Sequence, residues 1–149
     1  QEKAKNNYRR VAYSGRKSLK DGIPRDFKFY CFGEKIVLIH VALRKSEVHK
    51  EQNEHHYFTP NFELLQEKVM KHRDQAQTAI HRPDCWEEMV RSVQKIGKSV
   101  GIYMRIDMFA TNRGAVFGEF TPTPHGGKGY SEFADKFLGG FWRGEEGVE

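Results

Sequence analysis

The chain has 149 residues, 38% of them hydrophobic and 30% charged, a composition that argues against extended disorder and allows one domain with a folded core. No apolar run approaches the roughly 20 residues that a membrane helix needs, so we expect no membrane span. The formal net charge is +5 at pH 7, and the excess of lysine and arginine lies in residues 1–22, which we expect to form a basic arm.

The first predicted elements are two strands that form a hairpin. In residues 26–32 two sets of side chains alternate with a period of two, which is typical of a strand. Residues 35–43 hold the longest apolar run and follow a two-residue connection, so we expect them to return as the second strand. Cys31 falls within this pattern and is expected to be a buried free thiol. Because Cys85 is the other of only two cysteines, we expect no disulfide framework and favour a reducing, cytoplasmic compartment.

The next two segments are predicted to be a loop and a short helix. Residues 44–60 are polar and contain His49, His55 and His56, which suits a solvated loop better than a zinc site. In residues 61–73 apolar residues recur at near-helical spacing, which favours a short helix.

The clearest helix is predicted over residues 85–99. Asp84 and Glu87 have the spacing of a capping box, with Asp in place of Ser or Thr. Gly97 or Gly101 is expected to end the helix. Apolar residues at helical spacing form a stripe that we expect to face the core: Trp86, Met89, Val90, Val93 and Ile96.

Two strands and a last helix complete the predicted fold. Residues 102–109 and 115–120 are strand-like and are joined by a turn whose glycine can adopt a positive φ. A loop rich in proline and glycine occupies residues 121–129, and a short helix is predicted over 130–138. This order of elements predicts an α+β fold, an antiparallel β-sheet with packed helices.

Candidate ligands for a metal ion lie on this second hairpin. Arg105 and Asp107 are two residues apart, so their side chains share one face of a strand, as do Glu119 and Thr121 on the returning strand. Pairing across the turn would bring Asp107 near Glu119, and two close carboxylates need a cation between them. Oxygen ligands with room for water and phosphate favour Mg²⁺, and Arg105 suits a phosphate or carboxylate. From spacing alone, a surface hairpin whose acids face water is an equally good interpretation.

The motifs around these residues resemble the end of the ATP-grasp fold. The segments MRIDMF and GEFTPTPHGG, at 104–109 and 118–127, resemble the R-x-D strand and the E-x-N strand with its loop in D-alanine–D-alanine ligases. The TupA-like branch, associated with teichuronic-acid biosynthesis, is more similar, because PRDFKFYCF at 24–32 also resembles one of its motifs. Three matching segments in the same order extend the resemblance over residues 23–140.

The resemblance implies a Mg²⁺- and ATP-dependent carboxylate–amine ligase that forms an acyl phosphate and acts in cell-surface polysaccharide biosynthesis. It implies that Asp107 and Glu119 bind the metal and that Arg105 steadies the transferred phosphate or the tetrahedral intermediate. Thr121 stands where many ATP-grasp enzymes have a third ligand, Asn, and Thr is usual in this branch.

The resemblance also implies a nucleotide contact outside the hairpin, from Lys28 on the first strand. From the place of Arg44 just after the second strand, we expect this residue to face the phosphates. It divides the chain into the basic arm at 1–22, a partial ATP-grasp catalytic core at 23–140 and a flexible tail at 141–149. We expect a fragment or truncated form, with a partner domain or chain supplying the ATP-grasp lid, and a carboxylate substrate that is a glycan precursor.

The alternative is a binding module that holds a nucleotide or an anionic polymer without reacting it. The basic arm and aromatic residues such as Tyr8 and Tyr13 support it. Nucleic acid is the less favoured polymer, because Phe27 and Phe29 are better explained as core residues.

Overall fold

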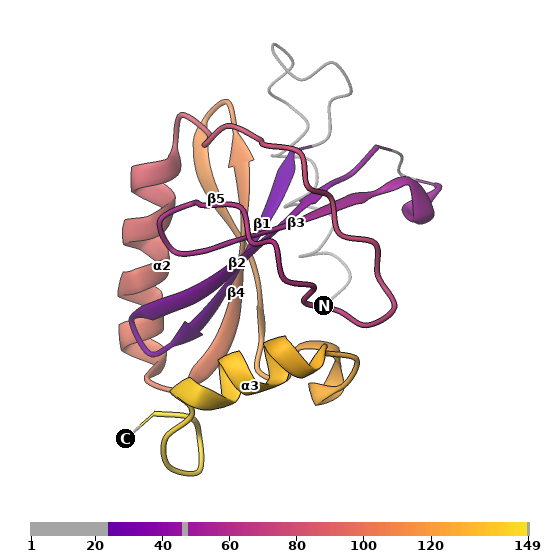
Figure 1. Cartoon of the computed structure of the whole chain (residues 1–149). Coiled ribbons are helices and arrows are strands. Elements are labelled where there is room, and N and C mark those ends of the chain that lie inside the picture. Colours follow the sequence, from indigo (N-terminus) through magenta and orange to yellow (C-terminus); the bar gives the residue numbers. More distant parts are fainter. Residues whose placement is uncertain (1–23, 46–47, 149) are drawn as a thin grey trace.

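The computed structural model describes residues 24–45 and 48–148, so the predicted basic arm lies outside the described residues. They form an antiparallel sheet of five strands in the order β3-β2-β1-β4-β5, with two α-helices (Figure 1). This confirms the predicted α+β fold. The strands are β1 (Arg25–Phe32), β2 (Lys35–Leu43), β3 (Glu54–Phe58), β4 (Tyr103–Thr111) and β5 (Gly114–Thr121). The helices are α2 (Trp86–Val100) and α3 (Glu132–Phe141), with short 3-10 turns η1 (Lys50–Gln52) and η2 (Pro124–Gly127).

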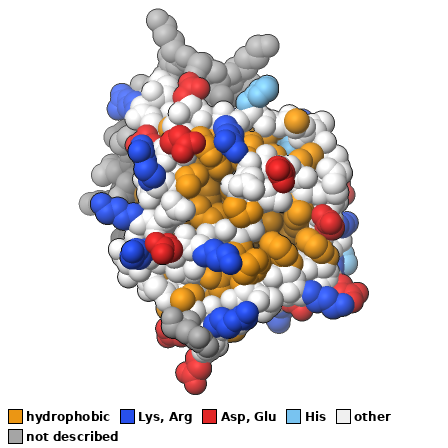
Figure 2. Space-filling view, turned by 60° about the vertical axis from the view of Figure 1, so that its left-hand side comes forward, with side chains coloured by type: hydrophobic (Ala, Val, Ile, Leu, Met, Phe, Trp, Pro, Cys, Tyr) orange, Lys and Arg blue, Asp and Glu red, His pale blue; other side chains and the backbone are white. Residues whose placement is uncertain are grey.

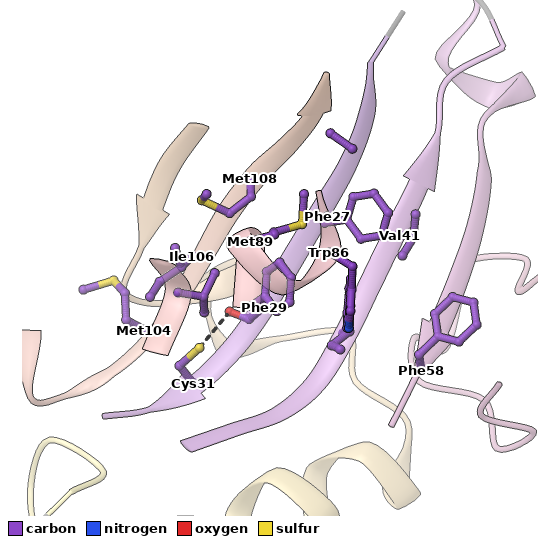
Figure 3. Close-up of a cluster of buried hydrophobic side chains, with 13 residues drawn as sticks. Phe27, Phe29, Cys31, Val41, Phe58, Trp86, Met89, Met104, Ile106 and Met108 are labelled. Atoms are coloured by element: carbon purple, nitrogen blue, oxygen red, sulfur yellow. Dashed lines mark hydrogen bonds between the residues drawn. The ribbon is translucent and has the colours of Figure 1, made fainter. Parts of the chain in front are cut away.

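Helix α2 covers one face of the sheet and forms the main core with it (Figures 1 and 3). Phe27, Phe29 and Cys31 point to this face from β1, because alternate residues of a strand share a face. Trp86 packs against both phenylalanine rings, with ring centroids 6.1 and 5.9 Å away. The predicted apolar stripe of the helix and the buried free thiol of Cys31 are thereby confirmed.

A second, smaller core lies on the opposite face, under α3. Tyr30 and Phe32 from β1 pack there with Leu38 from β2 and with Ala134 and Leu138 from the helix. Helix α3 lies across one end of the sheet (Figure 1), so the rest of this face is left for polar side chains. No helix of the described residues is long and apolar enough to cross a membrane.

The predicted loop at 44–60 contains a strand, β3, which extends the sheet beside β2. The prediction was wrong because the histidines of this strand hid its alternation. His55 and Tyr57 lie on the face opposite α2, whereas His56 and Phe58 lie on the α2 face. This strand buries polar side chains, and a search for alternating hydrophobic residues does not detect such a strand.

The predicted helix at 61–73 does not form. Phe62 has a φ of 63°, a left-handed conformation that is incompatible with a right-handed helix. The backbone pairs over long range instead, through bridges from Phe58 to Leu64 and from Met70 to Tyr130. The apolar residues of the segment serve both cores, with Leu64 in the first and Met70 in the second. Their near-helical spacing was therefore not a sign of one buried face.

The predicted capping box of α2 is also absent. Cys85 is the N-cap residue, and no side chain accepts a hydrogen bond there. The helix begins after a turn in which the Trp86 N–H donates to the Pro83 carbonyl at 3.0 Å. At its other end Gly101, with a φ of 69°, ends the helix as one of the two predicted glycines.

Charged side chains cover the surface on the α2 side, and hydrophobic side chains gather between them (Figure 2). Several residues at the margin of the main core are only partly buried: Ile36, Phe62, Leu64, Val90 and Ile96. Apolar atoms make up more than half of the accessible surface of a typical folded protein, so partial exposure at the margin of a core is expected.

A close contact between α2 and the first hairpin is made by two glycines. A Cβ atom added to Gly97 would lie 2.1 Å from the carbonyl oxygen of Gly33, in the turn between β1 and β2. Neither partner is the flexible end of a side chain, so a larger residue would push the helix away from the hairpin.

We predict that Gly97→Ala lowers the free energy of unfolding by about 1–2 kcal/mol, because an overpacking cost of up to about 3 kcal/mol outweighs a gain of about 1 kcal/mol in helix propensity. Urea denaturation would measure the loss. Gly139→Ala in α3 is the matched control, because a Cβ there meets no heavy atom within 4 Å. It should be neutral or slightly stabilising, and an equal effect of the two changes would contradict the packing explanation.

Candidate functional site

Five side chains, one from each strand, form a row across the sheet on the face opposite α2. The pairing of β4 with β5 sets Asp107 opposite Glu119, and the pairing of β1 with β4 sets Lys28 opposite Asp107. The remaining strands continue the row with His40, opposite Lys28, and Tyr57, opposite His40. The alternation that sends Phe27 and Phe29 into the core thus presents polar residues on the other face.

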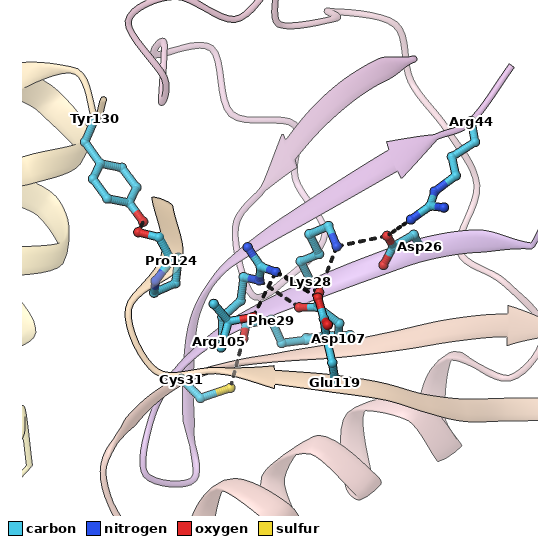
Figure 4. Close-up of polar contacts among 11 residues, drawn as sticks. Asp26, Lys28, Phe29, Cys31, Arg44, Arg105, Asp107, Glu119, Pro124 and Tyr130 are labelled. Carbon is cyan, nitrogen blue, oxygen red and sulfur yellow. Dashed lines mark hydrogen bonds and ion pairs between the residues drawn. The ribbon is translucent and has the colours of Figure 1, made fainter. Parts of the chain in front are cut away.

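Asp107 is the buried centre of this row. It is 2% exposed, and Arg105 holds both of its oxygens, with Nε 2.7 Å from Oδ1 and Nη2 2.8 Å from Oδ2 (Figure 4). Lys28 Nζ donates to the same Oδ2 at 2.8 Å. Each carboxylate oxygen has two lone pairs, so Oδ2 is fully used whereas Oδ1 retains one acceptor position.

Asp26 extends the network in the direction of β2. Its Oδ2 lies 2.9 Å from Lys28 Nζ and 3.1 Å from Arg44 Nη2, so Arg44 reaches the site through this carboxylate (Figure 4). Asp26 is 1% exposed, and its Oδ1 has no hydrogen-bond partner among the described residues. Sequence reasoning missed Asp26, although it stands two residues before Lys28, the same spacing that singled out Arg105 and Asp107.

Glu119 and Thr121 approach the network from β5. Glu119 is 65% exposed, with Oε1 3.7 Å from Arg105 Nη2, and Thr121 Oγ1 accepts a hydrogen bond from the same Nη2 at 3.0 Å. The strand bulges between Glu119 and Phe117, where a Cβ on Gly118 would lie 2.9 Å from the Asp107 carbonyl oxygen. The structure therefore brings all six predicted site residues into one network, although their roles stay predictions.

The carboxylates of this network fit a metal ion that keeps other ligands of its own. No group of three or more His, Cys, Asp or Glu suited to a metal occurs in residues 24–45 and 48–148. Asp107 offers one free acceptor position at Oδ1, and Glu119 opposite it is open to solvent. One or two carboxylates with waters and phosphate oxygens are typical of Mg²⁺.

Two histidines and an arginine continue the polar face beyond Lys28. His40 Nε2 and His55 Nδ1 are 2.9 Å apart, the His40 ring stacks on Tyr57 at 4.5 Å, and Arg73 Nη1 donates to the Tyr57 hydroxyl at 3.3 Å. His56 lies on the opposite face of β3 from His55, so these neighbours cannot share a metal ion as the less favoured zinc hypothesis required. The segment that carries Arg73 was predicted to be a helix, and no sequence signal placed it here.

Burial and positive charge keep these histidines neutral. Burial, followed by the charges of its neighbours His55 and Lys28, lowers the pKa of His40 well below its usual value. Burial and the Arg73 charge lower the pKa of His55 from 6.5 to about 4. Protonation of either ring would thus add a cation to a face that already holds several.

We predict that this histidine pair makes the fold sensitive to acid. The unfolded chain binds a proton at His55 near pH 6.5, whereas the folded chain resists it until about pH 4, so the free energy of unfolding should fall as the pH is lowered through this window. Denaturation at several pH values would measure the slope. His55→Gln should make it shallower, and His72→Gln, on an exposed residue, should not. Equal slopes in both variants would contradict the prediction.

The loop after β5 closes the site beside α3. Tyr130 donates from its hydroxyl to the Pro124 carbonyl at 3.4 Å (Figure 4). His125, Gly126 and Gly127 all have positive φ values, of 55°, 61° and 71°. The Gly126 N–H is used within the loop, because it donates to the Thr123 carbonyl at 3.0 Å.

Comparison with known proteins gives one match. A family model described as TupA-like ATP-grasp matches residues 14–142, which includes both hairpins, α2 and the whole network around Asp107. Searches among curated proteins and among solved structures found no match.

Proposed function

Because the chain belongs to the TupA-like ATP-grasp family, we propose that it carries the metal-binding part of an ATP-dependent ligase that joins a carboxylate to an amine. The observation that supports this is the pairing of a buried carboxylate, Asp107, with an exposed one, Glu119, on adjacent strands. Asp107 is held rigidly, and Glu119 is free to adjust. Such a pair suits a Mg²⁺ ion that arrives together with ATP phosphates.

The proposed reaction has two steps. A carboxylate oxygen of the substrate attacks the γ-phosphorus of ATP, so that ADP leaves and an acyl phosphate forms. An amine nitrogen then attacks the acyl carbon and loses a proton, the bond from that carbon to the phosphate oxygen breaks, and an amide and inorganic phosphate, which takes up the proton, are formed. When bound, Mg²⁺ would offset the negative charge of the phosphate oxygens. Neither step changes an oxidation state, so no further reactant is needed.

Residues around Asp107 position it and supply positive charge. The two hydrogen bonds from Arg105 fix the carboxylate plane, so the free lone pair of Oδ1 has one direction. The remaining N–H groups of Arg105 are available to a phosphoryl or tetrahedral oxygen, because the guanidinium has five donors. Lys28 and Arg44 lie along the same face, where they would favour the phosphates of a nucleotide, and Thr121 orients Arg105.

Membership of the family supports a proposal about the substrate classes. We propose that the carboxylate belongs to a precursor of a cell-surface polysaccharide and that the reaction takes place in the cytoplasm, where ATP is available. An anionic glycan precursor is compatible with the basic groups on this face of the sheet.

We predict that Glu119→Gln weakens Mg²⁺-dependent ATP binding at least tenfold, because it removes one of two charged metal ligands. The stability of the fold should hardly change, because Glu119 is exposed and only loosely paired. Calorimetric titration with ATP and Mg²⁺ would measure the affinity. Asp107→Asn is a less clean variant, because it leaves Arg105 and Lys28 without their counter-charge.

The matched control for this prediction is Glu87→Gln, an exposed carboxylate in the first turn of α2, on the other side of the sheet. It should bind Mg²⁺ and ATP as the unchanged chain does. Equal affinity of the Glu119→Gln and Glu87→Gln variants would show that Glu119 is not a metal ligand.

A further inference from the structure

Arg73 differs from Lys28 and Arg105 on the polar face in having no counter-ion among residues 24–45 and 48–148. Lys28 and Arg105 pair with buried carboxylates, whereas no Asp or Glu in the described part of the chain forms an ion pair with Arg73. The Arg73 side chain is partly buried, and its contact with the Tyr57 hydroxyl uses one of five N–H groups. A partly desolvated guanidinium is stabilised when an anion pairs with it.

The hydrogen bond between His40 and His55 sets which nitrogen of His55 carries a hydrogen. His40 is 2% exposed, and its Nδ1 has no partner within the described residues. A buried acceptor without a partner is less costly than a buried N–H without one, so His40 should carry its hydrogen on Nε2 and donate it to His55 Nδ1. His55, which is only partly buried, then has its own hydrogen on Nε2 and can donate it to a ligand.

The positive charges of this face lower the pKa values of the same two histidines. Partial desolvation and then the charges of Arg73, Arg105 and Lys28 lower the pKa of His125, in the loop after β5. The charges of Arg73 and Lys28 also contribute to the lowered pKa of His55. The geometry agrees, because Arg73 donates a hydrogen bond to Tyr57, which stands in the same row across the sheet as Asp107 and two residues from His55 on the same strand face.

We propose that Arg73 and His55 form a subsite for an oxyanion, a carboxylate or phosphate group of a ligand whose other end reaches Asp107. A guanidinium can donate two parallel hydrogen bonds to either group, and the neutral His55 ring adds a third donor. This inference rests on the proposed function, because the reacting atoms of the ligand would lie at Asp107.

The position of the subsite indicates which part of the ligand it takes. Neighbouring strands lie about 4.8 Å apart, so Tyr57 on β3 and Asp107 on β4 are separated by three spacings, about 14 Å. The subsite would therefore bind a group remote from the bond that forms. A second carboxylate or a phosphate on the acyl substrate fits this position, because the phosphates of the nucleotide lie at Asp107 in the proposed function.

Calorimetric titration of the full 149-residue chain without Mg²⁺ tests the subsite, with pyrophosphate, ADP and glutarate as separate probes. We expect at least one probe to bind, and Arg73→Gln to weaken that binding at least tenfold, because a charge-assisted pair is lost. Binding of glutarate would identify a carboxylate as the group that the subsite takes, and binding of pyrophosphate or ADP a phosphate. Absence of binding by all three, or unchanged affinity in Arg73→Gln, would overturn the proposal.

Two further variants keep the outcome interpretable. Arg73→Lys retains the charge without the planar fork, so it should bind with intermediate affinity and decides the question if Arg73→Gln fails to fold. Arg91→Gln, on an exposed residue of α2, should bind like the unchanged chain. Titration of the unchanged chain with ATP and Mg²⁺ separates the two claims. Mg²⁺-dependent ATP binding without Mg²⁺-free binding of any probe would overturn the subsite alone, whereas the reverse result would overturn the metal site alone.

Discussion

The polar face of the sheet is arranged around the buried negative charge of Asp107, which neighbouring cations compensate. An ionised carboxylate at this depth costs several kcal/mol unless cations and hydrogen bonds surround it. Arg105 comes from the same strand and Lys28 from the neighbouring one. The ion pair between Lys28 and Asp107 therefore depends on the pairing of β1 with β4 and also stabilises it. Lys28 in turn is shared with Asp26, which binds Arg44. A change in the charge of Asp107 is therefore expected to disturb ion pairs and hydrogen bonds on three strands.

One face of the sheet forms the main core, and the opposite face carries the candidate site. The side chains under α2 are apolar and tightly packed, down to a helix glycine that leaves no room for a Cβ. The opposite face carries a row of polar residues, one from each strand, and α3 covers only one end of it. The rigid apolar layer holds the backbone from which the polar side chains project, and so it fixes distances in the site without taking part in it.

The sequence predicted the parts of this molecule that follow local periodicity. Both hairpins, α2 and the shared face of Arg105 and Asp107 could be anticipated, because a period of two or of 3.6 residues decides them. Strand β3 was missed because His55 and His56 are polar on both faces, and burial of a histidine leaves no mark in a hydrophobic pattern. The segment around Phe62 was misjudged because its backbone pairs with residues distant in sequence. Arg73 could not be placed for the same reason, since its position depends on how that irregular segment folds over β3.

The measurement that tests the account most directly is calorimetric titration of the unchanged chain with ATP, with and without Mg²⁺. If Asp107 and Glu119 hold the metal, ATP should bind clearly more tightly when Mg²⁺ is present, and Mg²⁺ should bind more tightly when ATP is present, because the coupling is reciprocal. ATP binding of equal strength in both conditions, or none by a folded chain, would contradict the account. The polar row would then have to be explained as a structural ion network and not as a metal site.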